Sequence, residues 1–215
     1  MEIFGHRGAA GLVAENTVAG FRRAAELGCY GIECDVRAVE GQVVLLHDAT
    51  VDRTTDGHGT LAELGAAGLR RLDTGAGPVP WVAEVLPLMA EYPDLIWNLE
   101  LKDVASAPLL IEEMETWPRS IRRRALVSSF LRAALEPWTG TGVALARLAE
   151  ELTPALVEDA LRLGCCAMHL DRARLRPAVV PVARRAGLAV RAYTVNDPAT
   201  ARRLAGLGVQ GVFTD

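Results

Sequence analysis

A few short segments of this 215-residue sequence carry the side chains that could do chemistry. Glu33 and Asp35 stand two residues apart, and Glu100 lies in a later segment. Carboxylate oxygens are hard ligands that suit Mg²⁺ or Ca²⁺ better than zinc, which favours histidine and thiolate. These three carboxylates are therefore candidate ligands of a divalent cation, either Mg²⁺ or Ca²⁺.

The basic residues and histidines of these segments complement a metal. Arg7 and Lys102 supply the positive charge that a phosphate needs, arginine as a two-pronged donor and lysine as a point charge. His6 and His47 can act as general acid and general base, because the pKa of histidine lies near neutrality. A metal, phosphate-binding cations and an acid–base pair together indicate a centre that cleaves phosphodiesters.

A repeated unit of helix, glycine and short apolar strand must position these residues. Thr153-Pro154 is a typical helix start and Gly164 a typical helix end. Asn16 is expected to cap a first helix that runs to about Leu27. Strands that alternate with helices predict a parallel sheet. We expect its strands at residues 3–6, 31–35, 96–101, 125–129, 143–148, 167–170, 189–195 and 209–214.

Eight parallel strands in a chain of this length predict one α/β domain, a (β/α)8 barrel of the TIM type that spans residues 1–215. Residues 49–80 lack clear periodicity, and we expect them to form a small insertion that covers one end of the barrel. The sequence stops at Asp215, directly after the eighth expected strand, so the closing C-terminal helix is absent from it.

The apolar run that ends at His47 follows the second strand too closely for a parallel crossover, so we expect an antiparallel hairpin. A two-residue turn at 40–41 would place His47 across from Cys34, on the face away from the carboxylates. A three-residue turn at 40–42 would place His47 across from Asp35. We favour the second register, because it brings the histidine to the carboxylates.

In such a barrel the active site forms at the C-terminal ends of the strands. Glu33 and Asp35 share one face of the second strand, while Asn98, Glu100 and Lys102 share one face of the third. Burying these charges unpaired would cost on the order of several kcal/mol each. They must therefore serve one another or a ligand.

The composition narrows the class of protein further. Half of the residues are hydrophobic and 23% are charged, which is typical of a globular chain. The net charge of −4 excludes a dominant basic surface for nucleic acid, although a local phosphate site stays possible. No apolar run approaches ~20 residues, and the N-terminus lacks a secretory signal. We expect a soluble cytoplasmic protein without stable membrane insertion, whose four cysteines are reduced thiols.

The order of these segments resembles the glycerophosphodiester phosphodiesterase family, in its bacterial cytoplasmic type, over nearly the whole chain. The resemblance rests on His6-Arg7-Gly8, Glu15-Asn16-Thr17, Glu33-Cys-Asp35-Val36, His47-Asp48, Asp52-Arg-Thr-Thr55, 80–86, Asn98-Leu-Glu-Leu-Lys102, 128–130, Tyr193-Thr-Val-Asn196 and Gly211-Val-Phe-Thr-Asp215.

The resemblance implies a TIM-type barrel that hydrolyses small glycerophosphodiesters to an alcohol and sn-glycerol 3-phosphate with a bound divalent cation. It leaves open whether the neighbouring glycerol hydroxyl or water attacks, which headgroup is preferred, and whether the chain forms a homo-oligomer. It implies that His6 and His47 are the acid–base pair. It implies a metal site at Glu33, Asp35 and Glu100. The substrate or its phosphate would be contacted by Arg7, Lys102, Glu15 and Tyr193.

The sequence also departs from the family. Tyr193 stands where the family usually has tryptophan, and the final helix that commonly follows Asp215 is missing.

Two other functions stay open. A lysophospholipase D-like or phospholipase C-like enzyme would need an apolar membrane-binding rim, and no exposed aromatic loop is evident. A non-catalytic barrel that binds phosphate ligands would be expected to lack a histidine or a carboxylate, and none is lost.

The remaining polar residues have plainer interpretations. Glu15 and Asn16 could serve only to cap the first helix, although the resemblance suggests that Glu15 faces the site. His58 is expected in an exposed loop, and His169 either lines the pocket or lies in the core. The run 122–124 is expected to be a solvated helix end, and Cys165-Cys166 to serve packing.

Overall fold

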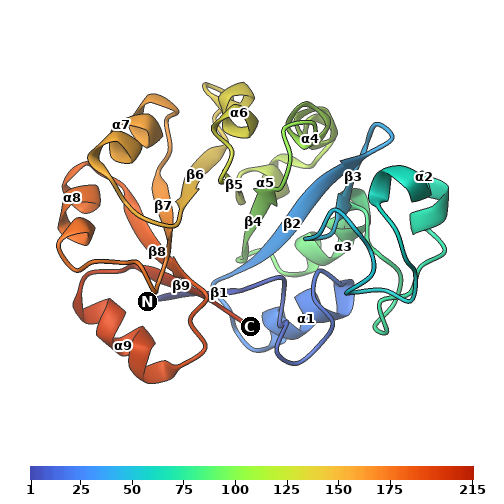
Figure 1. Cartoon of the computed structure of the whole chain (residues 1–215), viewed down its shortest axis with the longest axis horizontal. Helices are drawn as coiled ribbons and strands as arrows, with labels where there is room; N and C mark the ends of the chain where they lie inside the picture. The colour runs from blue at the N-terminus through green and yellow to red at the C-terminus, as the bar shows by residue number, and fades with distance from the viewer.

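Eight parallel strands close into a barrel with helices around the outside in the computed structural model, which describes residues 1–215 (Figure 1). The barrel closes because β1 pairs with β2 on one side and with β9 on the other. The predicted TIM-type fold is confirmed. Its strands are β1 (Glu2–Gly5), β2 (Gly31–Val39), β4 (Ile96–Leu101), β5 (Ala125–Ser129), β6 (Ala144–Ala149), β7 (Ala167–Asp171), β8 (Ala189–Tyr193) and β9 (Gly211–Thr214).

The helices begin and end largely where the sequence signals stand. Thr153 caps α7 with its side chain, proline follows at the first helical position, and Gly164 beyond the helix has a φ of 75°. The helices are α1 (Val18–Glu26), α2 (Leu61–Leu69), α3 (Val82–Glu91), α4 (Ser106–Glu115), α5 (Arg119–Arg122), α6 (Arg132–Leu135), α7 (Pro154–Arg162), α8 (Val179–Arg185) and α9 (Pro198–Gly206), with a 3₁₀ turn at Glu136–Trp138.

Side chains alternate between the inside of the barrel and the helices outside it. The register places Glu33 beside Asn98 and Asp35 beside Glu100 on neighbouring strands, on the inward face. Intervening residues such as Cys34 and Leu99 are fully buried in the large apolar core between strands and helices. The polar side chains inside the barrel are therefore surrounded by an apolar layer between the strands and the outer helices.

The hairpin forms, but its predicted register is wrong. β3 (Gln42–Leu45) pairs antiparallel with β2, and Val39 lies opposite Gln42 across a two-residue turn. Glu40 and Gly41 make this turn with φ values of 46° and 76°, and positive φ at both central residues is typical of a type I′ hairpin turn. The ladder ends at Leu45, so the direction of His47 is set by the chain beyond the strand, not by the pairing parity.

The insertion at 49–80 has a small apolar core of its own. Leu61 and Leu69 from α2 pack there with Val44 of the hairpin and with Val51 and Trp81. The insertion thus covers the hairpin side of the barrel (Figure 1). No helix of the structure has the length and apolar character needed to cross a membrane.

Arg124 is a second correction, because it is buried and not a solvated helix end. Its guanidinium donates to the carbonyls of Met89, Tyr92, Leu95 and Ser120 at 2.7–3.1 Å. An arginine has five N–H donors, and here they satisfy three carbonyls at and beyond the end of α3 and one carbonyl in α5. The residue precedes β5, on the barrel face opposite the strand C-termini.

We predict that Arg124→Met lowers the free energy of unfolding by about 2–3 kcal/mol, because buried carbonyls lose their donors. Urea unfolding measures this change. Arg123→Met is the matched control: Arg123 is exposed, and we expect a change within about 0.5 kcal/mol. Equal effects of the two substitutions would contradict the structural role given to Arg124.

Candidate active site

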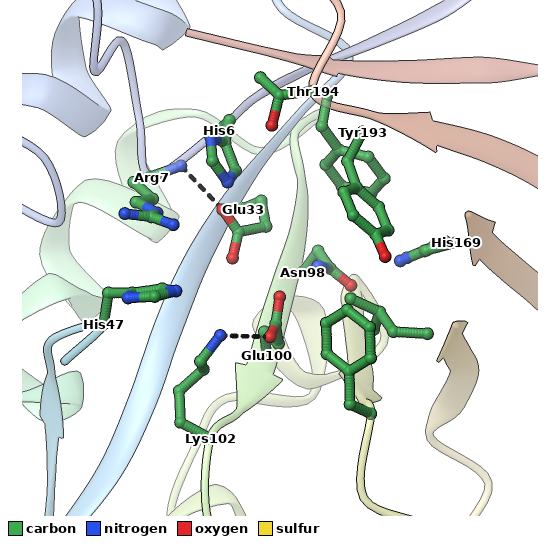
Figure 2. A pocket seen from close by; sticks show the side chains of 13 residues that line it. His6, Arg7, Glu33, His47, Asn98, Glu100, Lys102, His169, Tyr193 and Thr194 are labelled. Atoms are coloured by element: carbon green, nitrogen blue, oxygen red, sulfur yellow. Dashed lines mark hydrogen bonds and ion pairs between the residues drawn. The ribbon is translucent and has the colours of Figure 1, made fainter. Parts of the chain in front are cut away.

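A cavity of about 150 Å³ opens at the C-terminal ends of the strands. Figure 2 shows charged side chains on β2 and β4 and just beyond the ends of β1 and β4, with Tyr193 and His169 on the other side of the cavity. The cavity is lined by His6, Arg7, Glu33, His47, Asn98, Glu100, Lys102, Phe130, Leu148, His169, Tyr193, Thr194 and Phe213. The structure therefore brings together most of the residues that the sequence singled out.

Three buried carboxylates form the centre of the site. Glu33, Asp35 and Glu100 each offer an oxygen, and these oxygens lie within 4.8 Å of one another. The residues are 1%, 1% and 8% exposed. Such a set of hard oxygen ligands, on adjacent strands, has the chemistry of a Mg²⁺ or Ca²⁺ site.

Two cations lie against these carboxylates. The backbone N–H of Arg7 donates to Glu33 at 2.8 Å, and its side-chain Nε lies 3.2 Å from Asp35. Lys102 donates to Glu100 at 2.6 Å and lies 3.5 Å from Asp35. Arg7 and Lys102 thus stand beside the carboxylates, where they also line the cavity.

The carboxylates fit a cation by their unmet demands. Burial, and then the neighbouring Asp35, raise the pKa of Glu33 well above its ordinary value and also raise the pKa of Glu100. The Oε1 atom of Glu33 is buried without any hydrogen-bond partner. A divalent cation at this point would meet the unpaired oxygen and lower the pKa values of Glu33 and Glu100.

Asn16 belongs to this site, although the sequence interpretation placed it at the helix cap. Thr17 caps α1 instead, with its side chain accepting from the N–H of Gly20. The amide of Asn16 donates to Asp35 Oδ2 at 2.8 Å and accepts from the Asp35 N–H at 3.0 Å. The expectation of an Asn16 cap is wrong. The available signal was its place beside Glu15 in the segment 15–17.

The two histidines share one arrangement. The Nδ1 atom of His6 lies 2.6 Å from Asp215 Oδ1, and that of His47 lies 2.6 Å from Asp48 Oδ1. A carboxylate on Nδ1 fixes the tautomer and leaves Nε2 for the substrate. Burial lowers the pKa of His47, while Asp35 and Asp48 act in the opposite direction.

The carboxylate partners of the histidines were not identified as functional residues from the sequence. Both Asp48 and Asp215 lie within segments of the family resemblance, directly after His47 and at the end of the last strand. A carboxylate adjacent to a candidate catalytic histidine is the signal that could have identified Asp48. Asp215 has no such local signal, because it is 209 positions from His6.

Glu15 lies beside the cavity lining rather than in it. It accepts from Arg7 at 2.9 Å and from Arg53 at 2.7 and 2.8 Å. Burial by itself raises the pKa of Glu15, but the hydrogen bonds and charges of Arg53 and Arg7 together outweigh it, and the pKa is lowered. The carboxylate therefore holds Arg7 in place, and a direct contact of Glu15 with substrate stays a prediction.

Aromatic residues form one wall of the cavity. Tyr193 packs edge-on against Phe130 at 6.0 Å between ring centroids, and its hydroxyl donates to the carbonyl of Ala149 at 3.1 Å. Phe130 and Leu131 are 39% and 40% exposed beyond the end of β5. The rim thus carries an exposed aromatic residue, contrary to the expectation from the sequence.

Of the two remaining histidines, one is exposed and the other is buried. His58 is exposed, as predicted, and pairs with Asp52 at 3.2 Å. His169 is buried in the barrel and lines the cavity. All four cysteines are free, Cys165 being buried and Cys166 exposed.

Known proteins are similar to this chain in sequence and in fold. Residues 6–134 and 124–215 match the model of the glycerophosphoryl diester phosphodiesterase family. A glycerophosphodiester phosphodiesterase of Caldanaerobacter subterraneus subsp. tengcongensis is 31% identical over 228 residues, covering 99% of this chain and 93% of the relative.

Solved structures agree with the sequence relatives. A phosphodiesterase of Oleispira antarctica, solved with its product sn-glycerol 3-phosphate, superposes with a TM-score of 0.91 at 28% identity, covering 100% of this chain and 92% of that one. A glycerophosphodiester phosphodiesterase of Thermotoga maritima superposes with a TM-score of 0.83 at 25% identity, covering 99% and 93%. The chain therefore belongs to the glycerophosphoryl diester phosphodiesterase family, and its enzyme class is that of the glycerophosphodiester phosphodiesterases.

Proposed function

We propose that the protein hydrolyses small glycerophosphodiesters to an alcohol and sn-glycerol 3-phosphate, with a divalent cation at Glu33, Asp35 and Glu100 and with His6 and His47 as the acid–base pair. The observation that carries the proposal is one cavity that joins the buried carboxylates, two cations and two carboxylate-bound histidines. Family membership supports the substrate class. The cytoplasmic location stays a prediction.

The charged residues of the cavity would bind the phosphate. Arg7 is fixed by Glu15 and Asp35, and Lys102 is fixed by Glu100. Both side chains are therefore already ordered before substrate binds, so binding does not carry the entropic cost of ordering them. A bound cation would polarise the phosphoryl group and offset negative charge in the transition state. Arg7 and Lys102 add positive charge aimed at the same oxygens.

The histidines would move the protons of the reaction. One takes the proton of the attacking hydroxyl or water, and the other gives a proton to the leaving oxygen of the alcohol. Asp48 and Asp215 hold the two rings so that each presents Nε2. Attack by water would give sn-glycerol 3-phosphate directly. Attack by the glycerol hydroxyl would release the alcohol and give a cyclic phosphate, which water would then open with the two histidines in exchanged roles.

The substrate class is tested directly by product release. We expect purified protein with Mg²⁺ or Ca²⁺ to release sn-glycerol 3-phosphate from glycerophosphocholine, glycerophosphoethanolamine or glycerophosphoglycerol, and EDTA to abolish release. Lysophosphatidylcholine belongs in the panel because Phe130 and Leu131 are exposed at the rim. No turnover of any glycerophosphodiester by metal-loaded protein would refute the proposed hydrolysis.

Metal binding and proton transfer should separate by mutation. Glu100→Gln should weaken Mg²⁺ or Ca²⁺ binding at least about 10-fold, because even partners of a ligand contribute about 10–100-fold. His47→Ala should leave metal binding largely intact and lower kcat by about 10²–10⁴-fold. Calorimetric titration and steady-state kinetics measure the two effects.

Glu115→Gln is the control for this pair, since Glu115 is exposed on α4. It should change neither metal affinity nor kcat. Equal loss of metal in the Glu100 and His47 variants would show that the assigned roles are wrong.

Asp48→Asn and Asp215→Asn should each lower kcat by about 100-fold with metal affinity preserved, because the ring tautomers are no longer fixed. Asp48 is one of the groups that raise the pKa of His47. Its removal lowers that pKa, so the limb of the pH–rate profile due to His47 should move to lower pH.

Asp52→Asn provides the matched control, because Asp52 contacts the exposed His58 in the same way at 3.2 Å. Its kcat and pH profile should equal those of the wild type. Unchanged kcat in both Asp48→Asn and Asp215→Asn would exclude a positioning role for these carboxylates.

A further inference from the structure

The cavity has a neutral side that the phosphodiester chemistry leaves unexplained. Phosphate, metal and proton transfer use the charged residues of β1, β2, β4 and the hairpin. The cavity is also lined by the apolar or aromatic residues Leu148, Phe130 and Tyr193 and by two neutral polar residues, Asn98 and His169. In Figure 2, His169 and Tyr193 lie opposite His47 and Arg7, and Asn98 lies between the two sides. This neutral side is small, because the entire cavity holds about 150 Å³.

Asn98 contributes an unpaired acceptor. It is 1% exposed, and its Oδ1 atom has no hydrogen-bond partner. It lies next to Glu33 in the strand register, one layer deeper in the barrel than Glu100. A buried amide oxygen without a donor costs roughly 1–3 kcal/mol, so it calls for a ligand.

His169 contributes an unpaired donor. Its Nε2 atom lies 3.4 Å from Nη1 of Arg191, and Arg191 is itself held by Glu2 at 2.7 Å. Because arginine can only donate, Nε2 must accept, and the single proton of the neutral ring is then on Nδ1. Burial, followed by the charge of Arg191, lowers the pKa of His169 well below its ordinary value, so the ring is neutral.

The Nδ1 atom of His169 is likewise buried without a partner. Asn98 and His169 thus both line the cavity and hold one unpaired carbonyl acceptor and one unpaired N–H donor, with no charge on either. A hydroxyl group donates one hydrogen bond and accepts others, so its chemistry matches both the unpaired acceptor and the unpaired donor. A phosphate would need cations here, and the carboxylate beside Asn98, that of Glu33, belongs to the proposed metal site.

We propose that Asn98 and His169 bind the terminal hydroxyl of the substrate's glycerol, the one farther from the phosphate. The proposal deepens the proposed function and rests on it. The glycerol then enters the barrel, the phosphate lies at the carboxylates and cations, and the alcohol points to the open rim. Both residues are binding residues that set specificity for glycerol.

A pair of phosphates tests this assignment without turnover. We would titrate metal-loaded protein with sn-glycerol 3-phosphate and with the stereochemically matched propane-1,2-diol 1-phosphate, which lacks only the terminal hydroxyl. The wild type should bind sn-glycerol 3-phosphate at least about 10-fold more tightly than the diol phosphate, because without the terminal hydroxyl a buried donor and a buried acceptor stay unpaired.

Variants assign the preference to the two residues. His169→Leu and Asn98→Leu should bind both phosphates with nearly equal affinity, whereas His169→Gln, which keeps an N–H donor, should retain part of the preference. His58→Leu is the matched control and should behave like the wild type, since His58 is exposed and outside the cavity.

The wild-type comparison needs no variant to fold, and equal affinity for the two phosphates would overturn the proposal. It would also be overturned if His169→Leu weakened both phosphates alike and kept the preference. A preserved preference together with absent turnover would refute hydrolysis and leave the hydroxyl site standing. No binding of either phosphate would refute both.

Discussion

The mutual repulsion of three buried carboxylates is the constraint around which this barrel is arranged. Glu33, Asp35 and Glu100 have oxygens within 4.8 Å of one another inside the protein. Two cations, Arg7 and Lys102, reach them, so one negative charge of the three stays unbalanced. Without a cation the cluster would relax by taking up protons, as the raised pKa values of Glu33 and Glu100 indicate.

The cost of holding the cluster extends into the backbone of the first connecting loop. Arg7 and Asn16 have φ values of 52° and 54°, in the left-handed region that residues other than glycine seldom occupy. Both deliver a donor to the carboxylates: Arg7 through its N–H to Glu33, and Asn16 through its amide to Asp35. Their backbone strain, on the order of 1 kcal/mol each, is offset by bonds to charged oxygens. Strain at this loop is therefore a consequence of the site.

The features that could be predicted from the sequence are those governed by a local period or a local stop signal. Alternation on β2 and β4 placed Glu33, Asp35 and Glu100 on one face, and helix starts such as Thr153-Pro154 gave the barrel units. Partner choice across the fold follows no such period. Asn16 bonds a residue 19 positions away, and Arg124 bonds carbonyls up to 35 positions away, so both were misread as local features.

His47 lies at the cavity, as predicted, although the hairpin register from which its position was predicted is wrong. The parity of the hairpin pairs Val36 with Leu45, which would carry His47 opposite Cys34 if the ladder continued. The ladder stops at Leu45, and the chain then bends so that Arg37 Nε donates to the carbonyl of His47 at 2.8 Å. That bond, with Asp48 on Nδ1, fixes where the imidazole lies.

The interior of the barrel changes in polarity along its axis, and this gradient orders what it can bind. At the N-terminal end, Arg191 pairs with Glu2 and lies over the ring of Phe4, so these charges are already satisfied. The next layer holds the neutral Asn98 beside the carboxylate of Glu33, and Asp35 and Glu100 lie in the layer above. A ligand must match that order, with its uncharged polar part inward and its anionic part outward. Because the opposite orientation would bury an anion against Asn98 and His169, this distribution of charge favours the proposed orientation, with the glycerol inward and the alcohol at the rim.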